Sequence, residues 1–129
     1  MRTHVITVKD WMSKPVMNVK PDTTVQEAAT TMSKHSVGSL VVSKDGKRPD
    51  GIVTERDVLR KIIANKKDPE ATKVEDIMTK KVVTVDVDTS LLEISKIMSK
   101  NLLRRIVVTE KDKMIGIITS RDLLQLMAG

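Results

Sequence analysis

The stretch GIVTERDVL at residues 51–59 returns as GIITSRDLL at residues 116–124, with six of the nine positions identical. A longer match precedes it, because residues 10–42 align with residues 76–108 at 13 of 33 positions. Self-similarity over nearly all of a chain of 129 residues indicates two copies of one structural unit. Copies this small bury little apolar surface alone, so we expect the two to pack on each other.

The two predicted repeats, residues 1–65 and 66–129, show the same order of elements. A short turn with the motif Asp-x-Met comes first, and a strand, a helix, two further strands and a last helix follow. Thr24 and Ser90 each stand three residues before a glutamate, a spacing that caps and begins a helix. The expected strands are residues 16–19, 39–43 and 51–54 in the first repeat, and 82–85, 105–109 and 114–119 in the second.

Apolar strands joined through amphipathic helices predict the fold class. We expect an α/β (α+β) chain of two pseudo-symmetric repeats packed as an intramolecular pair, each a small three-stranded sheet with helices on one face. The chain has no Phe or Tyr, so Val, Ile, Leu and Met must fill the core. The expected inner faces of the two first helices are Val25, Ala28, Ala29 and Met32, and Leu91, Ile94, Ile97 and Met98.

The repeated motif Thr-x-Arg-Asp has two readings. In the structural one, Thr54 and Thr119 cap a helix and the aspartates three residues later complete a capping box, worth about 1–2 kcal/mol each. In the functional one, Thr and Arg bind phosphate while the carboxylate of Asp57 or Asp122 accepts from a ribose diol, as acidic residues do in dinucleotide folds.

Arg56 and Arg121 favour the functional reading. An arginine in the first turn of a helix faces the positive end of the helix dipole, which is unfavourable, yet the choice occurs twice. A guanidinium at this position suits a phosphate group. The alternative is that each arginine forms an ion pair with its neighbouring aspartate or with a residue across a dimer.

The order Asp-x-Met, valine-rich strand, Asp-Thr-Thr-x-x-Glu-Ala, Gly-Ser-Leu-Val-Val and Gly-Ile-Val-Thr-Glu-Arg-Asp resembles the cystathionine-β-synthase (CBS) domain. The resemblance covers residues 9–127 and occurs twice, as in the tandem pair called a Bateman module. It implies a regulatory sensor that binds an adenosyl ligand of the AMP, ADP or ATP type in two clefts between the repeats. It also implies a homodimer, no required cofactor and a separate, unknown effector protein.

The resemblance also assigns residues to the two clefts. Asp57 and Asp122 would bind the ribose hydroxyls, and Thr54 and Thr119 the phosphate. The adenine would lie against Val16, Met17 and Asn18 in one cleft and Val82, Val83 and Thr84 in the other. The same clefts would be lined by Val37, Gly38 and Ser39 and by Leu103, Arg104 and Arg105.

The two clefts differ in charge. Gly38 and Ser39 are small and neutral where Arg104 and Arg105 are large and cationic. Successive side chains of a strand point to opposite faces, so one of the two arginines can face the cleft. We therefore expect the second cleft to prefer the more phosphorylated ligand.

Composition leaves one alternative function open. A net charge of +6 and a pI near 9.7 suit anionic partners, so nucleic-acid binding is the second hypothesis. Against it, the single Trp offers one stacking platform and no helix-turn-helix pattern is present.

Apolar helix residues within 91–94 and 123–127 would supply a dimer face.

We expect no enzymatic activity and no metal site. The chain lacks Cys, and its recurring acids stand at helix caps rather than as an acid–base pair. No run of 18 apolar residues is present, so we expect no membrane span. Missing cysteines and the absence of an apolar leader in MRTHVITVKD lead us to expect a cytoplasmic protein.

Overall fold

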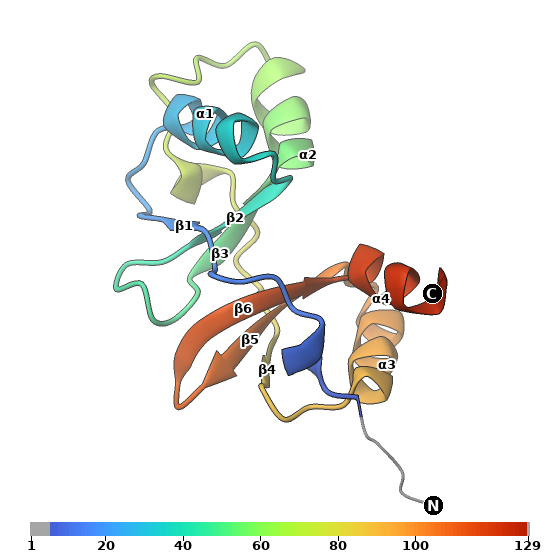
Figure 1. The fold of residues 1–129 in the computed structure, drawn as a ribbon. Helices are drawn as coiled ribbons and strands as arrows, with labels where there is room; N and C mark the ends of the chain where they lie inside the picture. Colours follow the sequence, from blue (N-terminus) through green and yellow to red (C-terminus); the bar gives the residue numbers. More distant parts are fainter. Residues whose placement is uncertain (1–5, 129) are drawn as a thin grey trace, which may run out of the picture. The chain divides into compact units, whose positions relative to one another are not determined.

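The computed structural model describes residues 6–128, which form two compact units (Figure 1). One unit consists of residues 17–82. The other combines residues 6–16 with residues 83–128. The segment that opens the first sequence repeat therefore folds with the strands of the second repeat.

The unit of residues 17–82 contains a three-stranded sheet in the order β1-β2-β3. Strands β1 and β2 are parallel, joined by a helix, and β2 and β3 form an antiparallel hairpin. A π-helix, η2, continues directly from the single turn α2. The elements are β1 Asn18–Val19, α1 Val25–His35, β2 Ser39–Val42, β3 Gly51–Thr54, α2 Glu55–Asp57, η2 Val58–Ile63 and the 3-10 turn η3 Val74–Asp76.

The other unit repeats this topology with the order β4-β5-β6, again parallel and then antiparallel. Its hairpin is longer, and the pairing shifts between Val108 and Thr109. The elements are the 3-10 turn η1 Val8–Asp10, β4 Thr84–Asp86, α3 Leu91–Asn101, β5 Arg105–Glu110, β6 Lys113–Thr119 and α4 Ser120–Ala128. The expected fold class is confirmed. The first strand of each repeat starts two residues later than expected. Val16 and Met17 lie before β1, and Val82 and Val83 lie before β4.

Helices α1 and α3 begin where the sequence predicts. The hydroxyl of Thr24 accepts the Glu27 N–H at 3.1 Å, and the hydroxyl of Ser90 accepts the Glu93 N–H at 3.1 Å. Both helices end on a residue with left-handed backbone, Ser36 and Leu102, each with φ of 53°. The predicted inner residues are buried except Ala29 and Ile97, which are half-buried.

Each unit has its own core between the helices and one face of its sheet. In residues 17–82, Leu40, Val42 and Val53 share the inner sheet face because Leu40 pairs with Val53. They pack against buried residues of α1 and against Ile62 of η2. In the other unit the matching strand residues are Ile106, Val108 and Ile118. The helices therefore cover one face of each sheet, as expected.

The segments that open the two sequence repeats complete these cores crosswise. Val8, fully buried, lies in the core with α3 and β6, and Val74 lies in the core with α1 and β3. Trp11 and Met12 pack against the core that contains Val8, and Met78 packs against the core that contains Val74.

Antiparallel bridges fix both segments to the third strand of the sheet. Ser13 exchanges two backbone hydrogen bonds with Ile117, at 2.8 and 3.0 Å, and Thr79 exchanges two with Ile52, at 2.9 and 3.0 Å. The segments pass so close to the strand that a side chain on Gly51 would collide with Met78, and one on Gly116 with Met12. The glycine that opens the repeated motif is thus explained by packing.

The β2–β3 loop is organised around Asp45. Its Oδ1 accepts the N–H groups of Lys47 at 2.8 Å and Arg48 at 3.0 Å, and the hydroxyl of the buried Ser43 at 3.3 Å. The backbone N–H of Arg48, followed by that of Lys47, lowers the pKa of the Asp45 carboxyl below its ordinary 3.8. Gly46 follows with a φ of 75°, a left-handed backbone that suits glycine in a turn.

None of the helices within residues 6–128 combines the length and the apolar character needed to cross a bilayer.

Candidate functional site

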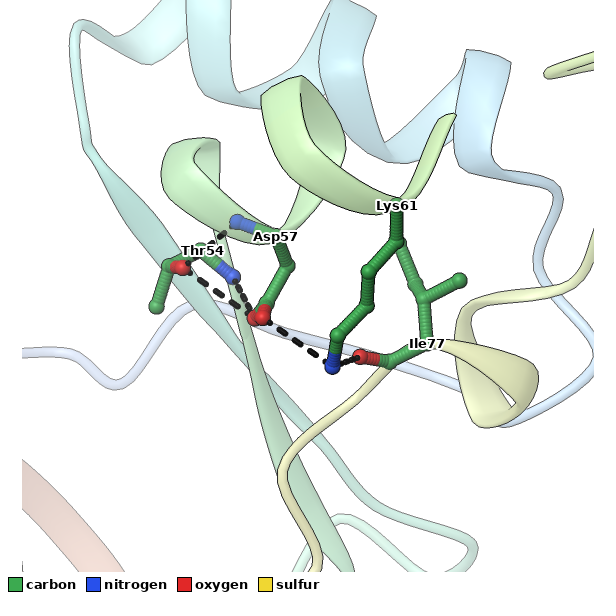
Figure 2. A network of polar contacts seen from close by, with 4 residues as sticks. All are labelled: Thr54, Asp57, Lys61 and Ile77. Atoms are coloured by element: carbon green, nitrogen blue, oxygen red, sulfur yellow. Dashed lines mark hydrogen bonds and ion pairs between the residues drawn. The ribbon is translucent and has the colours of Figure 1, made fainter. Parts of the chain in front are cut away.

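The junction of β3 and α2 holds the first Thr–Asp pair in a closed set of hydrogen bonds (Figure 2). The backbone N–H of Thr54 donates to Asp57 Oδ2 at 2.9 Å, and the Thr54 hydroxyl donates to the same oxygen at 3.1 Å. The Asp57 N–H donates to Thr54 Oγ1 at 3.1 Å. This is the capping box of the structural reading, and it leaves Asp57 Oδ1 outside the box.

The junction of β6 and α4 repeats this geometry. The Thr119 N–H and hydroxyl donate to Asp122 Oδ2 at 2.8 and 3.1 Å, and the Asp122 N–H donates to Thr119 Oγ1 at 3.2 Å. In both units the carboxylate is half-buried and held in one orientation. A capping box does not exclude a binding role, since one carboxylate oxygen stays outside it.

Lys61 distinguishes the first pair from the second. Its ammonium lies 3.3 Å from Asp57 Oδ1 and donates to the backbone carbonyl of Ile77 at 2.6 Å (Figure 2). The position that matches Lys61 in the other repeat, 65 residues later, is Leu126. Sequence reasoning missed Lys61, although its spacing of four residues from Asp57, present in one repeat only, is visible in the sequence.

Arg56 and Arg121 are both exposed. Among the described residues, 6–128, Lys61 and Asp57 form the one ion pair within 4.0 Å. Neither arginine therefore forms an ion pair with its neighbouring aspartate. The intramolecular alternative for these arginines is therefore not observed. Both guanidinium groups are free within the described chain to meet an anion.

The predicted strand residues are brought to these junctions by backbone bonds. The Glu55 N–H donates to the carbonyl of Gly38 at 3.0 Å, and the Ser120 N–H donates to that of Arg104 at 2.9 Å. The start of the second strand thereby abuts the start of the following helix in each unit. Ser39 pairs with Thr54, and Arg105 with Thr119.

Most of the residues predicted in and before the first strand are connected to the second strand of their sheet. The Val41 N–H donates to the Met17 carbonyl at 3.0 Å, and the Val107 N–H donates to that of Val83 at 3.1 Å. Asn18 and Thr84 begin the parallel pairing with β2 and β5. Val16 and Val82 are the residues at which the chain passes from one unit to the other. Val37 and Leu103, also predicted, follow the ends of α1 and α3 and are half-buried.

A groove of about 580 Å³ lies on the helical side of the first unit. It contains two of the predicted residues, Val37 and Gly38, but neither Thr54 nor Asp57. Its lining residues are Ala29, Met32, Ser33, Ser36, Val37, Gly38, Glu55, Val58 and Leu59. The groove therefore adjoins the β3–α2 junction at Gly38 and Glu55 without including the Thr–Asp pair.

The CBS domain family is matched twice by the chain, at residues 8–64 and 74–129. The chain belongs to the CBS domain family, as a tandem pair. Such a pair is a regulatory module, and the resemblance stated from the sequence is confirmed.

Relatives of the CBS pair include longer proteins. A protein of Methanopyrus kandleri is 35% identical over 121 residues, covering 93% of this chain and 62% of the relative. The CBS domain-containing protein CBSX3, mitochondrial, of Arabidopsis thaliana is 42% identical over 108 residues, covering 81% of this chain and 52% of the relative. The chain thus spans between half and two thirds of the length of these two relatives.

Solved structures agree with the fold over nearly the whole CBS pair. A conserved protein from Pyrococcus horikoshii shares 34% identity, with a TM-score of 0.85 and coverage of 99% and 96% of the two chains. A CBS domain pair in complex with 5′-methylthioadenosine and S-adenosyl-L-methionine shares 29%, with a TM-score of 0.86 and coverage of 98% of each chain. A hexameric CBS-CP12 protein from bloom-forming cyanobacteria shares 27%, with a TM-score of 0.82 and coverage of 93% and 70%.

Proposed function

We propose that this CBS pair is a sensor that binds an adenine nucleotide of the AMP, ADP or ATP type at its two Thr–Asp junctions. One observation carries the proposal: both units hold a Thr–Asp pair in the same hydrogen-bonded geometry, with an exposed Arg beside the Asp in the sequence. The solved pair with two adenosyl compounds bound supports the ligand class.

Each group has a defined role in this proposal. The carboxylate oxygen outside the capping box accepts from the ribose hydroxyls, because the other oxygen already accepts two hydrogen bonds from the threonine. Arg56 and Arg121 contribute positive charge for the phosphate. The threonine hydroxyl donates to the aspartate in the structure, so it must rotate to donate to a phosphate oxygen. No group acts on a bond of the ligand, so we propose binding without turnover.

The second site is proposed to favour the more phosphorylated ligand. Arg104 is exposed and Arg105 half-buried at the start of β5, and neither is in an ion pair within residues 6–128. The matching residues of the other unit, Gly38 just before β2 and Ser39 at its start, are uncharged. One additional guanidinium facing the ligand favours each added phosphate charge in the second site alone.

Calorimetry with AMP and ATP tests the site assignment. Asp57→Asn and Asp122→Asn each remove one charged acceptor, so each should abolish one class of binding sites and leave the other. Thr24→Ala is the matched control, because it removes a helix cap of similar worth, about 1 kcal/mol, away from both junctions. Binding that survives in the double Asn variant, or an equal AMP to ATP preference at both sites, contradicts the respective part of the proposal.

Nucleic-acid binding rests on the net charge of +6 alone, and no further feature of the described residues favours it. Retention on RNA that falls steeply with salt would favour this alternative. We keep a cytoplasmic location as a prediction.

Self-association and an effector protein complete the proposal. Leu59 and Ile63 on η2, and Leu124 and Met127 on α4, are exposed apolar residues that suit a homodimer. Leu91 and Ile94, counted toward this face in the sequence, are buried within their own unit, which corrects that part of the expectation. Light scattering that gives the mass of a monomer contradicts the homodimer, and that of a hexamer shows larger assembly, as in the cyanobacterial protein.

A further inference from the structure

Lys61 connects the proposed ribose-binding carboxylate to residues 73–79, the segment that opens the second sequence repeat. Its side chain is 45% exposed, and its ammonium is held between Asp57 Oδ1 and the carbonyl of Ile77. Ile77 is buried and ends the turn η3. Two residues later, Thr79 forms the backbone bridge to Ile52. The lysine thus contacts the segment two residues before Thr79, the residue by which the segment is bonded to β3.

The Lys61 contact between Asp57 and Ile77 has no counterpart among the described residues of the other unit. Leu126 replaces Lys61, so within residues 6–128 Asp122 Oδ1 has no cationic partner. The helices differ as well. The Ala64 N–H bonds to the carbonyl of Leu59 and the Lys67 N–H to that of Ile62, five residues back in each case, whereas α4 is a regular α-helix. Single π-type turns of this kind are frequent at functional sites.

The ligand and the lysine require the same oxygen. Asp57 Oδ2 accepts two hydrogen bonds from Thr54, so the oxygen left for a ribose diol is Oδ1. That oxygen is the partner of the Lys61 ammonium. A diol that donates to Oδ1 therefore competes with the ammonium. An ammonium that leaves Oδ1 is no longer held in position to donate to the Ile77 carbonyl.

We infer that Lys61 makes the first site a switch: ligand binding at Asp57 removes one of the contacts that hold residues 73–79 and so loosens their bridge to Ile52, while binding at Asp122 has no such effect. This inference rests on the proposed nucleotide site and adds its regulation. By linkage, a segment that stays attached weakens ligand binding by the same factor. Because the ion pair is partly exposed, the factor is small, about two- to fivefold.

The test uses AMP as the probe and the Asp122→Asn background, in which the first site alone remains. Hydrogen exchange is followed at the Thr79 amide, which donates to the Ile52 carbonyl at 2.9 Å. With Lys61 present, saturating AMP should speed this exchange about two- to fivefold. Lys61→Leu, which copies the other unit, should remove that response and tighten AMP binding by a similar factor.

Two further variants keep the result interpretable. Lys61→Gln retains a donor for the Ile77 carbonyl without the charge, and it should likewise lose the response, so a folding defect in one variant is not decisive. Leu126→Lys in a chain with Asp122 intact places an ammonium beside that carboxylate, and it should weaken AMP binding there.

The outcomes separate the inference from the function on which it rests. If AMP binds and Asp57→Asn abolishes the binding, but the Lys61→Leu variant matches the unsubstituted chain in its exchange at Thr79 and in its affinity, the switch is refuted and the site stands. If the Asp122→Asn chain binds no AMP, both the site and the switch are refuted. If both Lys61 variants lose the AMP-dependent change in exchange at Thr79 and bind AMP more tightly than the unsubstituted chain, the switch is supported.

Discussion

Substitution of Gly51 by alanine tests the crosswise packing of the leading segments. A β-carbon at this position would lie 2.4 Å from Met78 Sδ, 2.8 Å from its Cγ and 3.0 Å from the Thr79 carbonyl oxygen. Favourable contacts between nonbonded carbon atoms begin at about 3.5 Å, so the sulfur must move away by about 1.1 Å. The carbonyl oxygen cannot follow easily, because its residue is bridged to Ile52.

The expected cost follows from this overlap. Extra volume in a packed site costs about 1–3 kcal/mol, and the loss of glycine freedom in the unfolded chain returns about 0.4–1 kcal/mol. Gly51→Ala should therefore lower the free energy of unfolding by about 1–2 kcal/mol. For a chain of 129 residues this corresponds to a fall in Tm of about 3–8 °C.

A double-mutant cycle identifies which methionine is responsible. Met78→Ala removes the colliding atoms, so the pair Gly51→Ala with Met78→Ala should be less destabilised than the sum of the single changes by about 1 kcal/mol. Gly51→Ala with Met12→Ala should be additive within about 0.5 kcal/mol, because Met12 packs on Gly116.

Thermal and urea unfolding of these variants supply the measurements. An unchanged Tm for Gly51→Ala refutes the close approach. Equal rescue by the two methionine variants refutes the crosswise assignment.

Two further predictions concern single residues. Leu102 has a φ of 53° and is 91% exposed, so Leu102→Gly relieves backbone strain and should raise the free energy of unfolding by about 0.5–1 kcal/mol. Leu92→Gly, in the first turn of α3, should instead lower it by about 0.5 kcal/mol, and destabilisation by both changes in urea unfolding would contradict this. The pKa of Asp45 lies below 3.8 in the folded loop, so its anion contributes stability that is present above pH 3.8 and lost as the pH falls through the lower folded value; a carbon NMR titration of the carboxyl with a midpoint at or above 3.8 would contradict this.

Much of the secondary structure follows from local sequence. Helix starts at Thr24 and Ser90 are set by a hydroxyl and a backbone N–H three residues apart, which a sequence shows directly. The repeat strengthened each assignment, because an element seen twice is supported by two independent stretches. The strand ends were less certain: β1 is a strand over Asn18–Val19 alone, since pairing with β2 rather than valine content determines its length.

Long-range features were not predictable in this way. Nothing local in residues 6–16 indicates that they pack with β6 rather than with the adjacent β1, because β6 lies far away in the sequence. In the other unit, the Lys61 contact with Ile77 joins residues brought together by the matching packing of residues 74–79 on β3. The roles of Thr54, Asp57 and their counterparts in binding stay predictions, since their geometry serves a helix cap and a ligand site alike.

The crosswise arrangement has a consequence for biosynthesis. The unit of residues 17–82 is fully translated as soon as residue 82 is added, and its bridge between Ile52 and Thr79 spans a short stretch of the nascent chain. Residues 6–16 emerge from the ribosome before all of that unit, yet their partner strand, with Ile117, is made only after the whole of that unit. The earliest described residues thus dock after the unit of residues 17–82 has been made, and Val8 and Trp11 remain available to chaperones until β6 has been translated.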